Sequence, residues 1–133
     1  MTEGAKKPQV CIVDDDKFLL DMYAIKFGER GYTVETAFNA AEVLQKFDQG
    51  MRPGVCLIDI IMPGMDGFEL IKQLKERNLA KDTALIILSN LGQKEDIERG
   101  TALGASGYII KANATPTEVV NKVEEILKTK LSV

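Results

Sequence analysis

The stretch Val55–Gly67, VCLIDIIMPGMDG, decides the fold of this chain. Its first four residues form an unbroken apolar run, which is the pattern of a strand buried on both faces of a parallel sheet. Asp59 follows that run directly, and Met62-Pro63-Gly64 comes soon after it. Proline fixes φ and glycine permits positive φ, so these residues are typical of a turn. The stretch therefore predicts a carboxylate held where a buried strand leaves the sheet.

Three further apolar segments end in polar residues in the same way. Residues 10–13 are followed by Asp14, Asp15 and Asp16. Residues 84–88 are followed by Ser89, and residues 108–110 are followed by Lys111. In open α/β sheets, ligands bind outside the carboxyl ends of the strands. We therefore expect the polar ends of four strands to converge on one site: Asp14, Asp15, Asp59, Ser89 and Lys111.

Strand-like and helix-like segments alternate five times along the chain, which predicts an α/β fold: a five-stranded, doubly wound parallel sheet with helices on both faces. Capping residues mark where helices begin, such as Asp16 before Lys17 and the box Thr115–Glu118 with Pro116 at the first helical position. For two of the helices we predict which residues face the core. We expect inward positions at Leu19, Leu20, Tyr23, Ile25 and Phe27 in the first helix, and at Ile97, Ala102 and Leu103 in the fourth.

The length and amino-acid composition of the chain are typical of one globular domain. The chain has 133 residues, with 17 basic and 20 acidic side chains, so its net charge of −3 argues against direct nucleic-acid binding. It has no long apolar run and no signal-peptide pattern, so we predict a cytoplasmic protein without membrane insertion. It has no histidine, and we expect Cys11 and Cys56 to be reduced and buried. We expect residues 1–8 to be a flexible leader and 9–130 the single domain, with no output domain.

These motifs together resemble the receiver domain of two-component response regulators, in particular the single-domain, chemotaxis-regulator-like members. The resemblance covers about Val10 to Leu127 and rests on the acidic pair, the aspartate before MPGMDG, the serine after the fourth strand, and GASGYIIK. It implies the flavodoxin-like strand order 2-1-3-4-5. It also implies that Asp59 is the phospho-acceptor, that Lys111 and Ser89 assist it, and that Ser89 and Tyr108 form the switch.

The acidic cluster predicts a metal ion. Two carboxylates about 4 Å apart repel by about 4 kcal/mol at an effective dielectric constant of about 20, so the cluster either takes up protons or binds a cation. Hard oxygen ligands favour Mg²⁺, with Mn²⁺ possible. The resemblance implies direct ligands from Asp15, Asp59 and the backbone carbonyl of Ile61, with Asp14 acting through water.

The function that the resemblance implies is phosphorelay signalling. Asp59 would take a phosphoryl group from a histidine kinase or histidine phosphotransfer protein in a Mg²⁺-dependent step. The face formed by the fourth helix, fifth strand and fifth helix would then switch to control a downstream protein partner, which the sequence does not name. We expect no enzymatic activity beyond the chain's own phosphorylation and dephosphorylation.

Other functions compete with this interpretation. A phosphorylation-independent binding module, or a receiver trimmed from a longer regulator, stays open as an alternative. A haloacid-dehalogenase-like phosphatase is disfavoured because Ile61 stands where its acid/base aspartate would be. A flavodoxin-like FMN carrier is disfavoured because three aspartates after the first strand would repel a phosphate.

One position departs from the family pattern. Ala112 follows Lys111, where receiver domains usually have a proline, often with a cis bond. A cis bond before a residue other than proline costs about 3–4 kcal/mol. We therefore predict a trans Lys111–Ala112 bond, with the long lysine side chain reaching the acidic site from a trans backbone.

Overall fold

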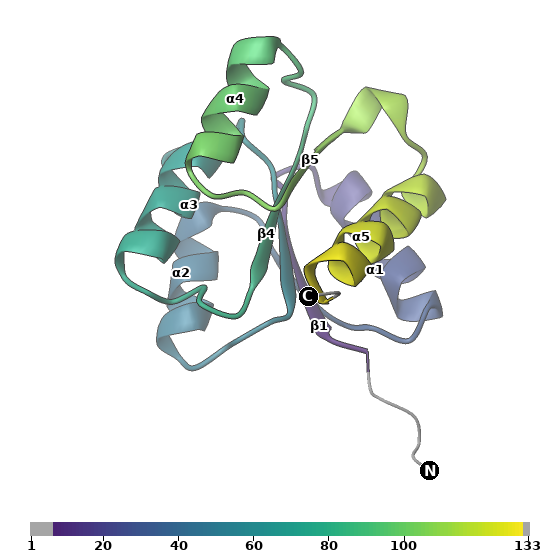
Figure 1. Cartoon of the computed structure of the whole chain (residues 1–133). Helices are drawn as coiled ribbons and strands as arrows, with labels where there is room; N and C mark the ends of the chain where they lie inside the picture. The colour runs from purple at the N-terminus through teal and green to yellow at the C-terminus, as the bar shows by residue number, and fades with distance from the viewer. Residues whose placement is uncertain (1–6, 132–133) are drawn as a thin grey trace.

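The computed structural model describes residues 7–131, the last two for their backbone only. Strands and helices alternate through this part of the chain (Figure 1). The strands are β1 Gln9–Val13, β2 Thr33–Ala37, β3 Val55–Ile58, β4 Ala84–Ser89 and β5 Gly107–Ile110. The helices are α1 Lys17–Glu29, α2 Ala40–Asp48, α3 Gly67–Glu76, α4 Lys94–Ala102 and α5 Pro116–Leu131, with a short 3₁₀ helix at Lys111–Asn113.

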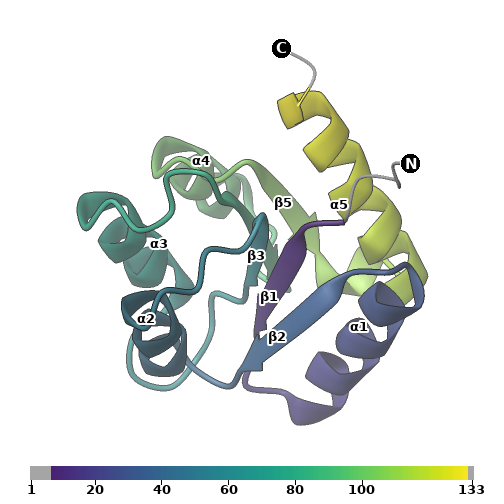
Figure 2. The same cartoon turned by 90° about the horizontal axis from the view of Figure 1, so that it is seen from below.

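The strands form one parallel sheet in the order β2-β1-β3-β4-β5. Helices α1 and α5 lie side by side on one face, and α2, α3 and α4 cover the other (Figures 1 and 2). Both the predicted doubly wound fold and the predicted strand order are confirmed. The fold brings the carboxyl ends of β1, β3, β4 and β5 to one edge of the sheet.

The core has two apolar layers, because successive side chains of a strand point to opposite faces. Strand side chains on the α2–α4 side include Cys11, Val13, Cys56, Ile58, Leu85 and Ile87. Those on the α1–α5 side include Val10, Ile12, Val55, Leu57, Ile86 and Leu88. The prediction that both cysteines are buried is confirmed, and both are free thiols.

The predicted helix starts at both ends of the chain are confirmed. The Leu19 amide donates to Asp16 Oδ1 at 3.2 Å, so Asp16 caps α1 directly after β1. At the start of α5, the Glu118 amide donates to Thr115 Oγ1 at 3.1 Å, and the Thr115 amide donates to Glu118 Oε1 at 2.8 Å. These caps satisfy amides that a helix leaves without an internal partner.

The predicted inward face of α1 is partly wrong. Leu20, Tyr23 and Phe27 are buried, but the Ile25 side chain is 59% exposed. A helix turns once every 3.6 residues, so Ile25 lies on nearly the opposite side from Leu20. Phe18 on that outer side is 72% exposed, which leaves α1 with apolar residues on two faces.

The predicted anchors of α4 are also partly wrong. Ala102 is exposed, Ile97 and Leu103 are only partly buried, and the one fully buried residue of this helix is Gly100. A Cβ at Gly100 would lie 2.5 Å from Ile87 Cδ1, so the absence of a side chain is what lets α4 approach the sheet. Helix α4 is therefore held by less apolar burial than the sequence predicted.

The predicted leader, residues 1–8, lies mostly outside the described residues. Lys7, which is described, forms an ion pair with Glu124 of α5 at 3.3 Å. Within the described residues, no helix combines the length and apolar character that crossing a membrane requires.

Candidate functional site

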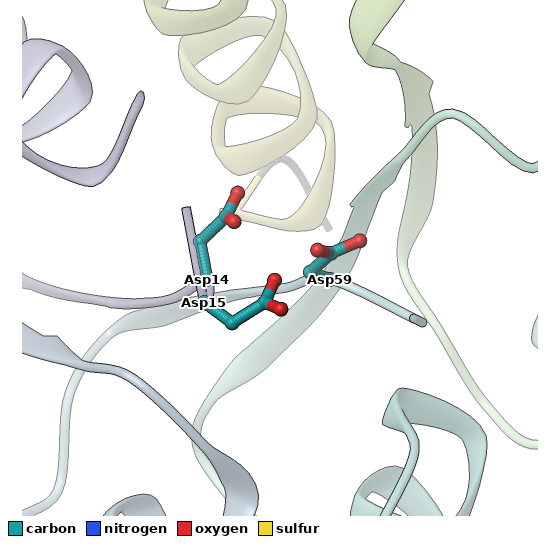
Figure 3. A group of neighbouring side chains, drawn as sticks. All are labelled: Asp14, Asp15 and Asp59. Atoms are coloured by element: carbon teal, nitrogen blue, oxygen red, sulfur yellow. The ribbon is translucent and has the colours of Figure 1, made fainter. Parts of the chain in front are cut away.

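An acidic cluster lies at the exits of two neighbouring strands (Figure 3). Asp14 and Asp15 follow β1, and Asp59 follows β3, with Val13 and Ile58 in register at the ends of the paired strands. One carboxylate oxygen from each aspartate lies within 4.8 Å of one from each of the others. The predicted convergence of these three carboxylates is confirmed.

Backbone hydrogen bonds hold the two buried members of the cluster. The Asp14 amide donates to the Ala37 carbonyl at 3.1 Å, and the Asp59 amide donates to the Val13 carbonyl at 3.1 Å. The Ile60 amide donates to Asp59 Oδ1 at 2.8 Å. Asp14 is 1% exposed and Asp59 is 5% exposed, whereas Asp15 faces solvent. The sheet thus sets the positions of two carboxylates and leaves the third at the mouth of the site.

Lys111 joins the cluster by a double ion pair. Its Nζ lies 2.7 Å from Asp14 Oδ2 and 3.2 Å from Asp59 Oδ2. Among the described residues no peptide bond is cis, so the predicted trans Lys111–Ala112 bond is confirmed. The residue also begins the short 3₁₀ helix Lys111–Asn113, which the sequence analysis did not predict. The long side chain reaches both carboxylates from this trans backbone.

Burial and charge act against each other on the ionisable groups. Burial raises the pKa of Asp59, Lys111 partly opposes that rise, and Asp14 adds to it by repulsion. Burial also acts to lower the pKa of Lys111, but the contacts with Asp14 and Asp59 outweigh it and the pKa of Lys111 is raised. The ammonium group of Lys111 therefore stays charged beside the three carboxyl groups.

The cluster fits a small divalent cation. Asp14 Oδ2 is buried and accepts no hydrogen bond from the described residues, because its 2.7 Å contact with Lys111 has the distance of an ion pair but not the geometry of a hydrogen bond. The donor set contains only oxygen, which suits Mg²⁺. Ile61 lies two residues after Asp59 with its side chain 62% exposed. The role of its carbonyl as a ligand stays a prediction.

Ser89 and Tyr108 meet at the backbone of Leu91. Ser89 ends β4, is 1% exposed, and its Oγ accepts a hydrogen bond from the Leu91 amide at 3.3 Å. The Tyr108 hydroxyl donates to the Leu91 carbonyl. In the described part of the chain neither residue is hydrogen-bonded to the acidic cluster. Sequence analysis missed Leu91 because its role rests on its peptide groups, which any residue type supplies.

Replacing Lys111 with methionine should raise the affinity for Mg²⁺ by about tenfold or more. Lys111→Met removes a positive charge that lies within 3.2 Å of two carboxylates, so it removes repulsion of an incoming cation. Calorimetric titration with Mg²⁺ measures the change. Lys94→Met is the matched control, because the Lys94 side chain is 85% exposed on α4. A Lys111→Met protein that binds Mg²⁺ no more tightly than the control would contradict the repulsion argument.

Comparisons with known proteins agree on one family. A sequence model described as the response regulator receiver domain matches residues 10–124. The chemotaxis protein CheY of Treponema pallidum is 32% identical over 123 residues, which are 90% of this chain and 83% of that protein. The probable transcriptional regulator ycf27 of Guillardia theta is 32% identical over 122 residues, which are 92% of this chain and 46% of that protein. This chain spans about half the length of the first curated relatives that it matches.

The solved structures support the same assignment. The chemotaxis response regulator CheY4 of Vibrio cholerae superposes with a TM-score of 0.80 at 30% identity, covering 89% of this chain and 97% of that one. The chain belongs to the response regulator receiver domain family. It is a phospho-acceptor receiver of two-component signalling, and receivers of this family bind Mg²⁺ through an acidic cluster such as this one.

Proposed function

We propose that Asp59 is the residue of this receiver that becomes phosphorylated, and that a histidine kinase or histidine phosphotransfer protein is the donor. One observation carries the assignment. The Asp59 carboxylate lies on rigid backbone at the end of β3, with the Lys111 ammonium 3.2 Å away and two further carboxylates beside it. Asp15 faces solvent. Asp14 contacts the same ammonium group, but it is less exposed than Asp59, at 1% against 5%.

Phosphoryl transfer depends on positioning and on neutralising charge. In the proposed step an Asp59 oxygen attacks phosphorus, the P–N bond to the donor histidine breaks, and the departing imidazole keeps the electron pair and takes up a proton. Asp15 and Asp59 would hold Mg²⁺ directly, with Asp14 acting through water, and the ion would supply positive charge beside the phosphoryl oxygens. Lys111 supplies a second positive charge to a phosphoryl oxygen, and the Ser89 hydroxyl can donate to another.

The switch follows from the contacts of Leu91. If Ser89 Oγ turns toward the phosphoryl group, its hydrogen bond with the Leu91 amide must change. The Leu91 carbonyl holds the Tyr108 hydroxyl, so the change extends from the loop after β4 to β5. Helix α4 follows that loop and buries only Gly100. We infer that the face formed by α4, β5 and α5 changes with phosphorylation and controls a protein partner.

Labelling with a small phosphodonor tests the proposed acceptor chemistry. The full chain incubated with acetyl phosphate and Mg²⁺ should gain the mass of one phosphoryl group, measured by intact-protein mass spectrometry. Chelation of the metal with EDTA should suppress the gain. A chain that gains no phosphoryl group in Mg²⁺, under conditions that label a purified receiver used as a positive control, would refute the proposal. It would favour a binding module that works without phosphate.

A further inference from the structure

A pocket lies at the edge of the sheet opposite the acidic site. Pro8, Tyr32, Gly54 and Asp82 line it, and they come shortly before β1, β2, β3 and β4, respectively, at the amino ends of the strands. Helix α5 passes beside the start of β1 and forms one side of the pocket (Figures 1 and 2). Its volume of about 530 Å³ is typical of sites for small molecules. We call it the amino-edge pocket.

The apolar part of the lining is held in place by the core and the sheet. It includes Pro8, Tyr32 and Leu127. Tyr32 is only 7% exposed, and its ring packs edge-on against the buried Phe27 ring with the two centroids 5.5 Å apart. The Gly54 amide donates to β1 and the Gly54 carbonyl accepts from β4, both at 2.9 Å. An apolar ligand would therefore meet a surface whose shape is already set.

Glu124 of α5 fixes the side of the pocket that this helix forms. Its carboxylate accepts hydrogen bonds from Arg30 Nη1 at 2.7 Å, Tyr32 Oη at 3.0 Å and Lys7 Nζ at 3.3 Å. These donors come from the end of α1 and from the residues before β2 and β1. Because α5 is tied to three separate places in the chain, a ligand does not have to order this wall when it binds.

The charges left over at the mouth of the pocket are negative. Asp82 and Glu125 line the pocket and are exposed, and among the residues that the structure describes neither forms an ion pair. Both lysines of the lining do have partners, since Lys7 pairs with Glu124 at 3.3 Å and Lys128 is engaged as well. We call Asp82 and Glu125 the rim carboxylates. An apolar lining with this rim complements a molecule that has an apolar body and a positive charge.

We propose that the amino-edge pocket binds a small organic cation, with an aromatic or branched aliphatic body and one ammonium group. The apolar body packs against Pro8, Tyr32 and Leu127, and the ammonium group lies at the mouth with the rim carboxylates. This site goes beyond the proposed function and does not rest on it. The cation and the phosphoryl group occupy opposite edges of the sheet, so neither excludes the other.

Three probes separate the contributions of the apolar body and the charge. Phenethylamine has both, phenylpropionate has the ring with the opposite charge, and ethylamine has the charge without the ring. The full chain is titrated with each probe in excess Mg²⁺, which keeps the amines from the acidic cluster, and backbone amide shifts in NMR spectra report where each probe binds.

Phenethylamine should shift the amides of Tyr32, Gly54 and Leu127 with a dissociation constant of about 1 mM or tighter, the range open to a ligand of this size. It should bind at least about threefold more tightly than phenylpropionate, the effect of an exposed ion pair. It should bind at least about tenfold more tightly than ethylamine, which buries far less apolar surface.

A double variant without the rim charges tests the charge argument. Asp82→Asn/Glu125→Gln should bind phenethylamine at least about threefold more weakly than wild type and should lose the preference over phenylpropionate. Asp21→Asn/Glu76→Gln is the matched control with the same net charge. Both of its positions are exposed, on α1 and α3, and neither lines the pocket. This control should bind phenethylamine like wild type.

Several results would overturn the proposal. They are the absence of amide shifts with every probe, as when another part of the chain fills the pocket, shifts confined to the acidic site, equal affinity for phenylpropionate, and equal loss in the two double variants. Sedimentation tests a second copy of the chain as the occupant, because a wild-type dimer that phenethylamine dissociates would point to self-association instead. The titrations involve no phosphoryl transfer, so failure of the proposed function is recognised separately.

Discussion

The Asp59→Asn protein is expected to gain no phosphoryl group from acetyl phosphate in Mg²⁺. Asparagine keeps the shape of the side chain but replaces the nucleophilic carboxylate with an amide. The substitution also removes one of the three charges that favour the cation. Intact-protein mass spectrometry over a time course measures the loss. Asp82→Asn, at an exposed position before β4, is the matched control and should be labelled like wild type. Labelling of Asp59→Asn at the wild-type rate would show that another residue is the acceptor.

The same substitution should stabilise the fold at neutral pH when Mg²⁺ is absent. The folded-state pKa of Asp59 is raised, first by burial and then by repulsion from Asp14, with Lys111 opposing in part. A carboxyl group with a raised folded-state pKa contributes stability below its unfolded-state pKa, and that contribution is lost as pH rises through the folded-state pKa. Asparagine has no such loss, so the melting temperature of Asp59→Asn should exceed that of wild type by a few degrees at pH 7 to 8.

Thermal unfolding in EDTA across the acid range checks this sign. The difference in melting temperature between Asp59→Asn and wild type should shrink as pH falls toward about 4, where the carboxyl group takes up its proton in both states. Adding Mg²⁺ at neutral pH should stabilise wild type more than the variant. A variant that is less stable than wild type at neutral pH in EDTA would mean that the attraction to Lys111 outweighs burial.

Gly67→Ala is expected to lower the free energy of unfolding by about 3 kcal/mol or more, at or beyond the upper end of typical overpacking costs. A Cβ at this position would lie 2.2 Å from the Asp59 carbonyl oxygen and 2.9 Å from Ile60 Cα. Both neighbours are backbone atoms, so neither can move without shifting the exit of β3. The Gly67 amide also donates to the Ile60 carbonyl at 3.0 Å, which ties the start of α3 to the same segment.

Urea unfolding measures the loss of stability, and labelling by acetyl phosphate reports the displacement of Asp59. Gly67→Ala should be labelled more slowly than wild type even where it remains folded. Gly28→Ala is the matched control, because a Cβ at Gly28 meets nothing within 4 Å. Alanine is the better helix former, so this control should be neutral or up to about 1 kcal/mol more stable. Equal stability of the two variants would contradict the close approach of α3 to Asp59.

The sequence by itself determined the elements and their ends. Apolar runs such as residues 55–58 predict buried strands, and the aspartate after each of two runs predicts where the acidic cluster lies, because strand formation and the side-chain alternation of a sheet are local properties. The caps at Asp16 and Thr115 were likewise predictable, since each side chain accepts a hydrogen bond from the amide three residues later in the chain. The trans bond after Lys111 followed from the cost of a cis bond before alanine.

Only the tertiary structure decided which residues touch across the chain. The double ion pair of Lys111 joins the residues that directly follow β1, β3 and β5, and the shared contacts of Leu91 join Ser89 to Tyr108. Sequence spacing predicts that such groups share an edge of the sheet. The distances between their side-chain atoms depend on the register of the strands and on the path of the backbone in the loops. The exposed apolar side chains of α1 show the same limit. An apolar side chain is favourable on either face of a helix until packing against the sheet and α5 buries one face and leaves Phe18 and Ile25 exposed.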